Sequence, residues 1–217
     1  MKQLTLISIL VLCSLGLKAQ QRVMALNFEN RPNVRAWWRD NPHVKFILDY
    51  EKDHQHGKSS EVCLEVNWDS IPSDRTWCWF TDLKIDTMAS EAMRGMLDRF
   101  KGKTWLSFWC NTGNGDTLWV QPLLFSRDLK GKWGSKKVFH VKSESWTFVK
   151  IKLSELPWEN WGSAGALPDF EKDDIVKYEL GLRNGITNEK GFIDARFDDI
   201  MITNYEPHED DLNHKNN

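Results

Sequence analysis

Cysteine and long apolar runs are scarce in this sequence, and each shortage excludes a class of protein. The chain has 217 residues and 4 cysteines, of which Cys63, Cys78 and Cys110 lie beyond the N-terminal segment. Three thiols form at most one disulfide, so a disulfide-stapled scaffold is excluded, and their spacing fits no zinc site. After residue 17 no apolar run approaches the roughly 20 residues that cross a bilayer, so no membrane-spanning segment is expected.

A strong excess of one charge and the common catalytic motifs are also missing. The 29 basic and 31 acidic side chains leave a net charge of −2, and 41% of the residues are hydrophobic. These values are typical of an ordinary globular protein, and a mildly acidic chain is a poor candidate for binding nucleic acid. No P-loop, nucleophile elbow or HExxH sequence is present, so the enzyme classes that carry them are excluded.

The N-terminus has the pattern of an export signal. A basic start at Met1-Lys2 is followed by an apolar run from Leu4 to Leu17 and by the small residue Ala19. This pattern predicts a signal peptide over residues 1–19 and a secreted, periplasmic or cell-surface location. Leu12 stands where a lipoprotein signal needs a small residue before its cysteine, so no lipid anchor is expected.

Short β-type segments recur along the rest of the chain. They are rich in Val, Ile, Phe and Trp and are separated by Gly, Asn, Asp and Pro, which predicts an all-β sandwich. We expect one domain over residues 20–205, one short amphipathic helix over 88–100 and a disordered polar tail over 206–217. The predicted strands are 23–28, 44–50, 61–68, 76–81, 105–111, 117–125, 138–141, 146–153, 176–184 and 192–203.

Five segments resemble a known group of β-sandwich domains. They are Leu26-Asn27-Phe28-Glu29, His56–Ser60 with the following Val62–Val66, Leu106–Trp109, Trp146–Leu153 and Ala195–Ile200. Their order and residue types resemble those of carbohydrate-binding module family 11 and related galactose-binding-like domains. The resemblance implies a two-sheet antiparallel jelly-roll sandwich with a structural calcium ion, for which Glu29 and Asp198 would be ligands.

Tryptophan is the abundant residue, with 12 copies against 3 tyrosines. An indole ring packs flat against the C–H groups of a sugar, while carboxylate, amide and guanidinium groups bind its hydroxyls. In the predicted strands 105–111, 117–125 and 176–184, alternation assigns the apolar residues to the core. The residues between them, which include tryptophans and side chains with amide, carboxylate and guanidinium groups, then face outward. We predict that this set forms one carbohydrate-binding face: Trp109, Asn111, Trp119, Gln121, Glu179 and Arg183.

Several other features leave two interpretations open. Trp77 and Trp79 alternate with Cys78, so alternation alone does not say which face of that strand is buried. Cys63 and Cys78 lie in segments that could pair as a hairpin and form a disulfide in an exported protein. The basic stretch 130–142 is either a solvated hairpin or a patch that binds uronate or sulfated polysaccharide through its charge.

Three functions follow from these patterns. The first is an exported, non-catalytic and monomeric protein that binds a polysaccharide or oligosaccharide. The second is a small jelly-roll polysaccharide lyase or glycoside hydrolase that uses the same cleft, although Asp194, Asp198 and Asp199 are the nearest approach to a catalytic pair of carboxyls. The third is a surface scaffold or adhesion domain that has kept the fold without the ligand.

Overall fold

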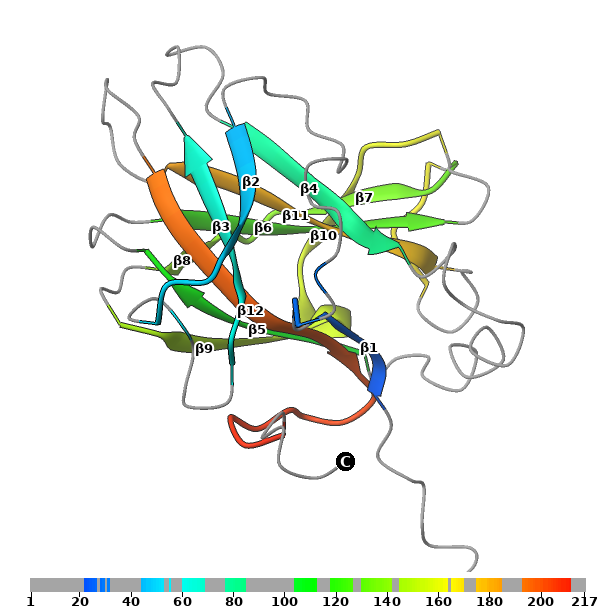
Figure 1. The fold of residues 1–217 in the computed structure, drawn as a ribbon. Coiled ribbons are helices and arrows are strands. Elements are labelled where there is room, and N and C mark those ends of the chain that lie inside the picture. Colours follow the sequence, from blue (N-terminus) through cyan, green and yellow to red (C-terminus); the bar gives the residue numbers. More distant parts are fainter. Residues whose placement is uncertain are drawn as a thin grey trace, which may run out of the picture.

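Two antiparallel sheets make up the protein in the computed structural model, which confirms the predicted two-sheet jelly-roll sandwich (Figure 1). The described residues are 22–26, 28–29, 31, 44–52, 55, 60–68, 77–84, 104–112, 118–126, 130–141, 145–163, 165–169, 175–184 and 193–211. The first sheet runs in the order β2 (Val44–Asp49), β3 (Cys63–Trp68), β12 (Ile193–Thr203), β5 (Trp105–Asn111) and β9 (Thr147–Lys152), with β1 (Arg22–Leu26) paired to β12. The second runs β10 (Trp158–Asn160), β7 (Lys132–Ser135), β6 (Leu118–Ser126), β11 (Ile175–Asn184) and β4 (Trp77–Lys84), with β8 (Phe139–Val141) paired to β6.

The core lies between the sheets and is built from alternate residues of each strand. In β5 the apolar residues Leu106, Phe108 and Cys110 are buried, and in β6 Leu118 and Val120 are buried, as alternation predicts. Contributions from neighbouring strands close the same cluster, among them Val44, Phe46, Leu64, Val66, Ile151, Leu180, Leu182, Ala195 and Phe197. The residues between these positions face outward, away from the partner sheet.

Two short strands, β7 and β10, were not predicted from the sequence. Both contain a tryptophan that is buried in the core, Trp133 at 2% exposure and Trp158 at 7%. The indole N–H of Trp133 donates to the carbonyl of Ala166 at 2.8 Å, and that of Trp158 donates to the carbonyl of Leu153 at 2.9 Å. These strands are only four and three residues long, which is too short for alternation to indicate a strand in the sequence.

The segments of Cys63 and Cys78, for which the sequence left a hairpin open, do not pair with each other. Cys63 lies in β3, which pairs with β2 and β12 of the first sheet, whereas Cys78 lies in β4, which pairs with β11 of the second. The connection between β3 and β4 therefore leads from one sheet to the other. Cys63 is a buried thiol, and burial raises its pKa.

The structure describes only part of the two ends of the predicted domain. The signal peptide and the helix over 88–100 lie outside the described residues. The ordered chain extends past residue 205, because Pro207 is buried and the Lys150 ammonium pairs with the Glu206 carboxylate at 2.5 Å. Within the described part of the chain, no helix is long and apolar enough to cross a membrane.

Candidate functional site

The six residues predicted to form one face lie on the outer faces of two different sheets. Trp109 and Asn111 are in β5, between β12 and β9 of the first sheet. Trp119 and Gln121 are in β6 of the second sheet, where β11 lies beside them. The prediction of a single face is therefore wrong, because alternation separates inward from outward residues but does not say to which sheet a strand belongs.

The outer face of the second sheet carries an aromatic stack. Trp119 lies on His140 of β8, with ring centroids 5.1 Å apart and an interplanar angle of 14°. The two residues are opposite each other in the β6–β8 ladder, so backbone pairing holds the rings together. Gln121, two residues along, is buried and donates its side-chain N–H to the carbonyl of Ser135 at 2.6 Å. Its amide therefore anchors β6 to the last residue of β7.

Trp161 forms a flat aromatic surface on the same outer face. Gly134, which pairs with Leu123 of β6, follows the inward-facing Trp133, so a side chain at Gly134 would point outward. The Trp161 ring occupies the space that such a side chain would need. Its indole N–H donates to Glu159 Oε1 at 2.8 Å, and 39% of the residue remains exposed. Because Gly134 has no side chain, the Trp161 indole can lie directly over the sheet.

Glu179 and Arg183 occupy register positions in the second sheet beside the β6 residues. In the β6–β11 ladder Arg183 is opposite Trp119, and Glu179 is opposite Leu123. On the far side of β11, Arg183 is opposite Trp77 of β4, and Gly181 is opposite Trp79. Because residues opposite each other in a ladder share a side of the sheet, Arg183 belongs to the row of Trp119 and Glu179 to the row of Leu123.

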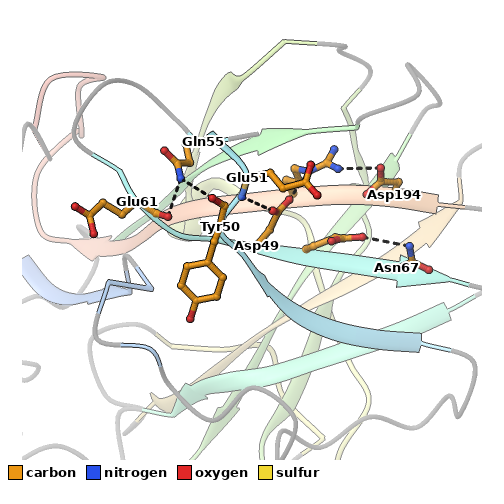
Figure 2. A network of polar contacts seen from close by, with 9 residues as sticks. Asp49, Tyr50, Glu51, Gln55, Glu61, Asn67 and Asp194 are labelled. Carbon is orange, nitrogen blue, oxygen red and sulfur yellow. Dashed lines mark hydrogen bonds and ion pairs between the residues drawn. The ribbon is translucent and has the colours of Figure 1, made fainter. Parts of the chain in front are cut away.

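The outer face of the first sheet carries a network of ion pairs (Figure 2). The Arg196 guanidinium binds Asp49 and Asp194, each at 3.1 Å, and the Arg196 side chain is 8% exposed. Burial alone would lower the pKa of Arg196, but the carboxylates of Asp194 and Asp49 outweigh it and raise that pKa. Burial raises the pKa of Glu65, whose carboxylate accepts a hydrogen bond from the Asn67 amide at 3.2 Å.

Trp109 is part of this first-sheet face and packs against a neighbouring strand. Its ring centroid lies 5.2 Å from that of Phe148 on β9, at an angle of 47°, and both residues are half-buried. Asn111, opposite Arg196 in the β5–β12 ladder, is also half-buried. Two of the predicted binding residues thus lie beside the Arg196 network and away from the Trp119–His140 stack.

Glu29 and Asp198, the ligands implied by the resemblance, lie in a tightly bonded acidic cluster. The Asp198 carboxylate is fully buried and accepts hydrogen bonds from Ser60 Oγ and from the Asp199 N–H, both at 2.8 Å. Glu29 Oε1 accepts the N–H of Glu61 at 2.8 Å. Burial, the charge of Asp199 and the charge of Glu29 raise the pKa of Asp198 to about 8.

The backbone beside both acids is strained. Phe28, directly before Glu29, has φ of 61°, and Asp199, directly after Asp198, has φ of 50°. Left-handed conformations cost a non-glycine residue roughly 1–2 kcal/mol, so surrounding contacts hold both carboxylates in place. Among the described residues, no group of three or more His, Cys, Asp or Glu side chains is arranged to hold a metal ion. A calcium ion would therefore need backbone or water oxygens beside these two carboxylates.

Comparison with solved structures gives a consistent group of folds. A family 11 carbohydrate-binding module from Clostridium thermocellum, in complex with a β-1,3-1,4-mixed-linked tetrasaccharide, aligns with a TM-score of 0.53 and 12% identity over 88% of this chain and 100% of that one. The fold is that of carbohydrate-binding modules. A family 30 module of a cellulosomal cellulase of Clostridium thermocellum aligns with a TM-score of 0.50 and 14% identity, covering 82% of this chain and 96% of that one.

A third structure agrees with these two. It is an N-terminal tandem of two family 22 modules from Paenibacillus barcinonensis, with a TM-score of 0.51, 15% identity and coverage of 88% of this chain and 51% of the tandem. No protein-family model and no curated protein matches this sequence. The resemblance inferred from the sequence segments is thus confirmed for the fold.

The sequence did not include Trp161 in the predicted face, and it left open whether the basic stretch with Lys132 and His140 binds a polysaccharide. Strand β10, directly before Trp161, is three residues long, so alternation does not assign Trp161 to a face. The one available signal was Gly134 between Trp133 and Ser135, since a glycine inside a strand often marks the close approach of another group. Which group approaches depends on a contact 27 positions along the chain, and the sequence does not show that contact.

Proposed function

We propose that this protein is an exported, non-catalytic carbohydrate-binding protein that holds a polysaccharide on the outer face of its second sheet. The observation that carries the proposal is Trp161, an exposed indole placed over Gly134 on the face that also carries the Trp119–His140 stack. Flat, exposed rings on a rigid sheet match the apolar side of a sugar ring. A protein of the same fold has been solved with a mixed-linked tetrasaccharide bound.

The positions of Asp194, Asp198 and Asp199, the acids nearest to a catalytic pair in the sequence, support the non-catalytic part of the proposal. Asp198 and Asp199 are buried at 0% and 3% exposure, and Asp194 is paired with Arg196 on the first sheet. Glycoside hydrolysis requires two carboxyls that flank an accessible sugar bond. These three acids therefore lie away from the aromatic face, where the sugar is proposed to bind.

Alanine variants of the two indoles test the binding face. Trp161→Ala and Trp119→Ala are each expected to weaken retention on the polysaccharide about tenfold, equivalent to about 1.4 kcal/mol, because each removes a stacking surface. Retention is measured by affinity electrophoresis in gels containing a panel of neutral and acidic polysaccharides. Gly134→Ala, which keeps the indole but forces the ring to move, is expected to weaken retention in the same direction.

Trp109→Ala is the matched control, because it removes an indole from the outer face of the opposite sheet. It is expected to leave retention unchanged. If Trp109→Ala abolishes retention while Trp161→Ala does not, the face is wrongly assigned. If the unaltered protein is retained by no polysaccharide of the panel, the binding function is wrong. Release of new reducing ends or unsaturated uronate would contradict the non-catalytic part.

We propose in addition that calcium binds at Glu29 and Asp198 and stabilises the fold. The support is the fully buried Asp198 carboxylate and the strained residues next to both acids. Calcium at about 100 times its Kd is expected to raise the free energy of unfolding by about 2.7 kcal/mol. For a domain of this size that corresponds to a rise in Tm of roughly 5–10 °C.

Thermal melts in excess calcium and in chelator measure this effect. Glu29→Ala is expected to remove the difference between the two melts, whereas the exposed Glu209→Ala is expected to retain it. Identical melts of the unaltered protein in calcium and in chelator would contradict the calcium proposal without affecting the binding face.

A further inference from the structure

Cations without carboxylate partners border the aromatic face of the second sheet. From Lys130 to Val141 the chain carries four lysines and one histidine and no acidic residue. No carboxylate of the described residues pairs with the ammonium groups of Lys132, Lys136 or Lys137. Elsewhere in the described chain, Lys150 and Lys152 bind Glu206 and Glu155. Glu159 is the acidic residue that the described chain places beside Trp161, and its carboxylate accepts the Trp161 indole N–H rather than pairing with a lysine.

Lys132 is the cation closest to the aromatic rings. Its Nζ lies 5.4 Å from the ring centroid of Phe125 and 6.0 Å from that of Trp161. The residue is half-buried, which limits the hydration of the ammonium and strengthens its interaction with an anion. A sugar stacked on Trp161 would thus have a cation at its edge.

The basic residues follow β6 along its outer face. Lys132 is opposite Phe125, and His140 is opposite Trp119 at the other end. Lys136 comes directly after Ser135, whose carbonyl binds the Gln121 amide in the middle of β6. At about 3.3 Å per residue, the distance from Phe125 to Trp119 is about 20 Å, enough for several sugar units.

The register extends the basic character across the sheet. Lys177 of β11 is opposite Phe125 in one ladder and opposite Lys84 of β4 in the other. The row Lys132–Phe125–Lys177–Lys84 therefore crosses four strands, about 14 Å at the usual strand spacing. Arg183 occupies the row of Trp119, and Glu179 is the one acidic position of β11 in these rows.

We propose that the polysaccharide held on this face is anionic, with its uronate carboxylates or sulfate esters bound by Lys132 and the neighbouring cations. This inference rests on the proposed function and names its substrate class. A neutral glycan needs hydroxyl-binding groups, whereas uncompensated ammonium groups beside stacking rings attract fixed anionic charges along a chain. The net charge of the whole protein is −2, so a general attraction to anions does not account for such binding.

Binding to paired polysaccharides that differ only in charge tests the proposal. Polygalacturonate is compared with its fully methyl-esterified form, and a sulfated galactan with its desulfated form, by calorimetry or affinity electrophoresis. The protein is expected to bind the charged member of at least one pair at least tenfold more tightly, and the pair concerned distinguishes carboxylate from sulfate. Raising NaCl from about 0.05 M to about 0.5 M is expected to weaken that binding roughly tenfold.

Lys132→Gln is expected to weaken binding to the charged glycan about fivefold and to weaken binding to the neutral member by a smaller factor. Lys150→Gln, which makes the same change of charge on the first sheet, is the control and is expected to have no effect. Equal binding of charged and neutral members, with Trp161→Ala weakening both, would overturn the anionic preference and leave the proposed function intact. Binding to the charged glycan that Trp161→Ala and Trp119→Ala do not weaken would instead overturn the proposed function, as would no binding to any of the four glycans.

Discussion

Replacing Arg196 by methionine is expected to lower the free energy of unfolding by about 3–5 kcal/mol. The guanidinium lies between Asp49, which is 6% exposed, and Asp194, so its removal leaves a buried carboxylate without its cation. The Arg196–Asp49 ion pair also links β12 to β2, which lie on either side of β3. Urea unfolding at neutral pH measures the change, and the midpoint is expected to move to lower urea with little change in the m-value.

The control for Arg196→Met is Lys150→Met, which breaks an exposed ion pair on the same sheet. Exposed pairs contribute little to stability because water and salt screen them, so this midpoint should stay close to that of the unaltered protein. The double variant Arg196→Met with Asp49→Leu is expected to recover part of the loss, since it also removes the stranded charge. Equal midpoints for Arg196→Met and Lys150→Met would show that the network does not stabilise the fold.

Replacing Asp198 by asparagine is expected to stabilise the calcium-free protein by several kcal/mol at pH 8. The folded pKa of Asp198 is raised to about 8, whereas an unfolded aspartate has a pKa of about 3.9. Between these values the folded state holds the proton that the unfolded state releases. The stability contributed by this group is therefore fully present below pH 4 and falls by roughly 1 kcal/mol per pH unit as the pH rises towards 8.

Asparagine fits the site because it retains the hydrogen bonds of the protonated acid. Its carbonyl oxygen can accept the Asp199 N–H, and the Ser60 hydroxyl lies 3.3 Å from a second acceptor, the carbonyl of Val62. Urea unfolding in chelator from pH 4 to pH 8 measures the slope, which Asp198→Asn should flatten. Asp210→Asn, at an exposed position, should leave the slope unchanged. A stability that rises with pH over this range would contradict the expected sign.

Much of the fold could be predicted because strand alternation is a local property of the chain. The segments around Leu106, Val120 and Leu182 each alternate over several residues, and all three residues are buried in the core. β7 and β10 escaped prediction because a strand of three or four residues contains too few alternations. There, pairing with neighbouring strands stabilises the extended backbone instead.

The candidate site could be predicted only in part. Alternation correctly predicted that Trp119 faces outward. Trp109 shows the same alternation in the preceding strand but lies on the opposite sheet. Trp161 was not part of the predicted face and is an exposed indole that lies over Gly134. Strand alternation depends on near neighbours, but membership of a sheet depends on long-range ladders, which no local pattern contains.

The sequence by itself determined the β-sandwich class, the inward and outward sides of its longer strands, the excess of tryptophan and the acid-free basic stretch. Only the tertiary structure decided which tryptophans share a face, because β5 and β6 are consecutive in the chain yet belong to opposite sheets. It also seated Trp161 over Gly134 and brought the Lys132 ammonium beside two aromatic rings. These arrangements arise from contacts between segments distant in sequence, whose relative positions are set by the packing of the whole core.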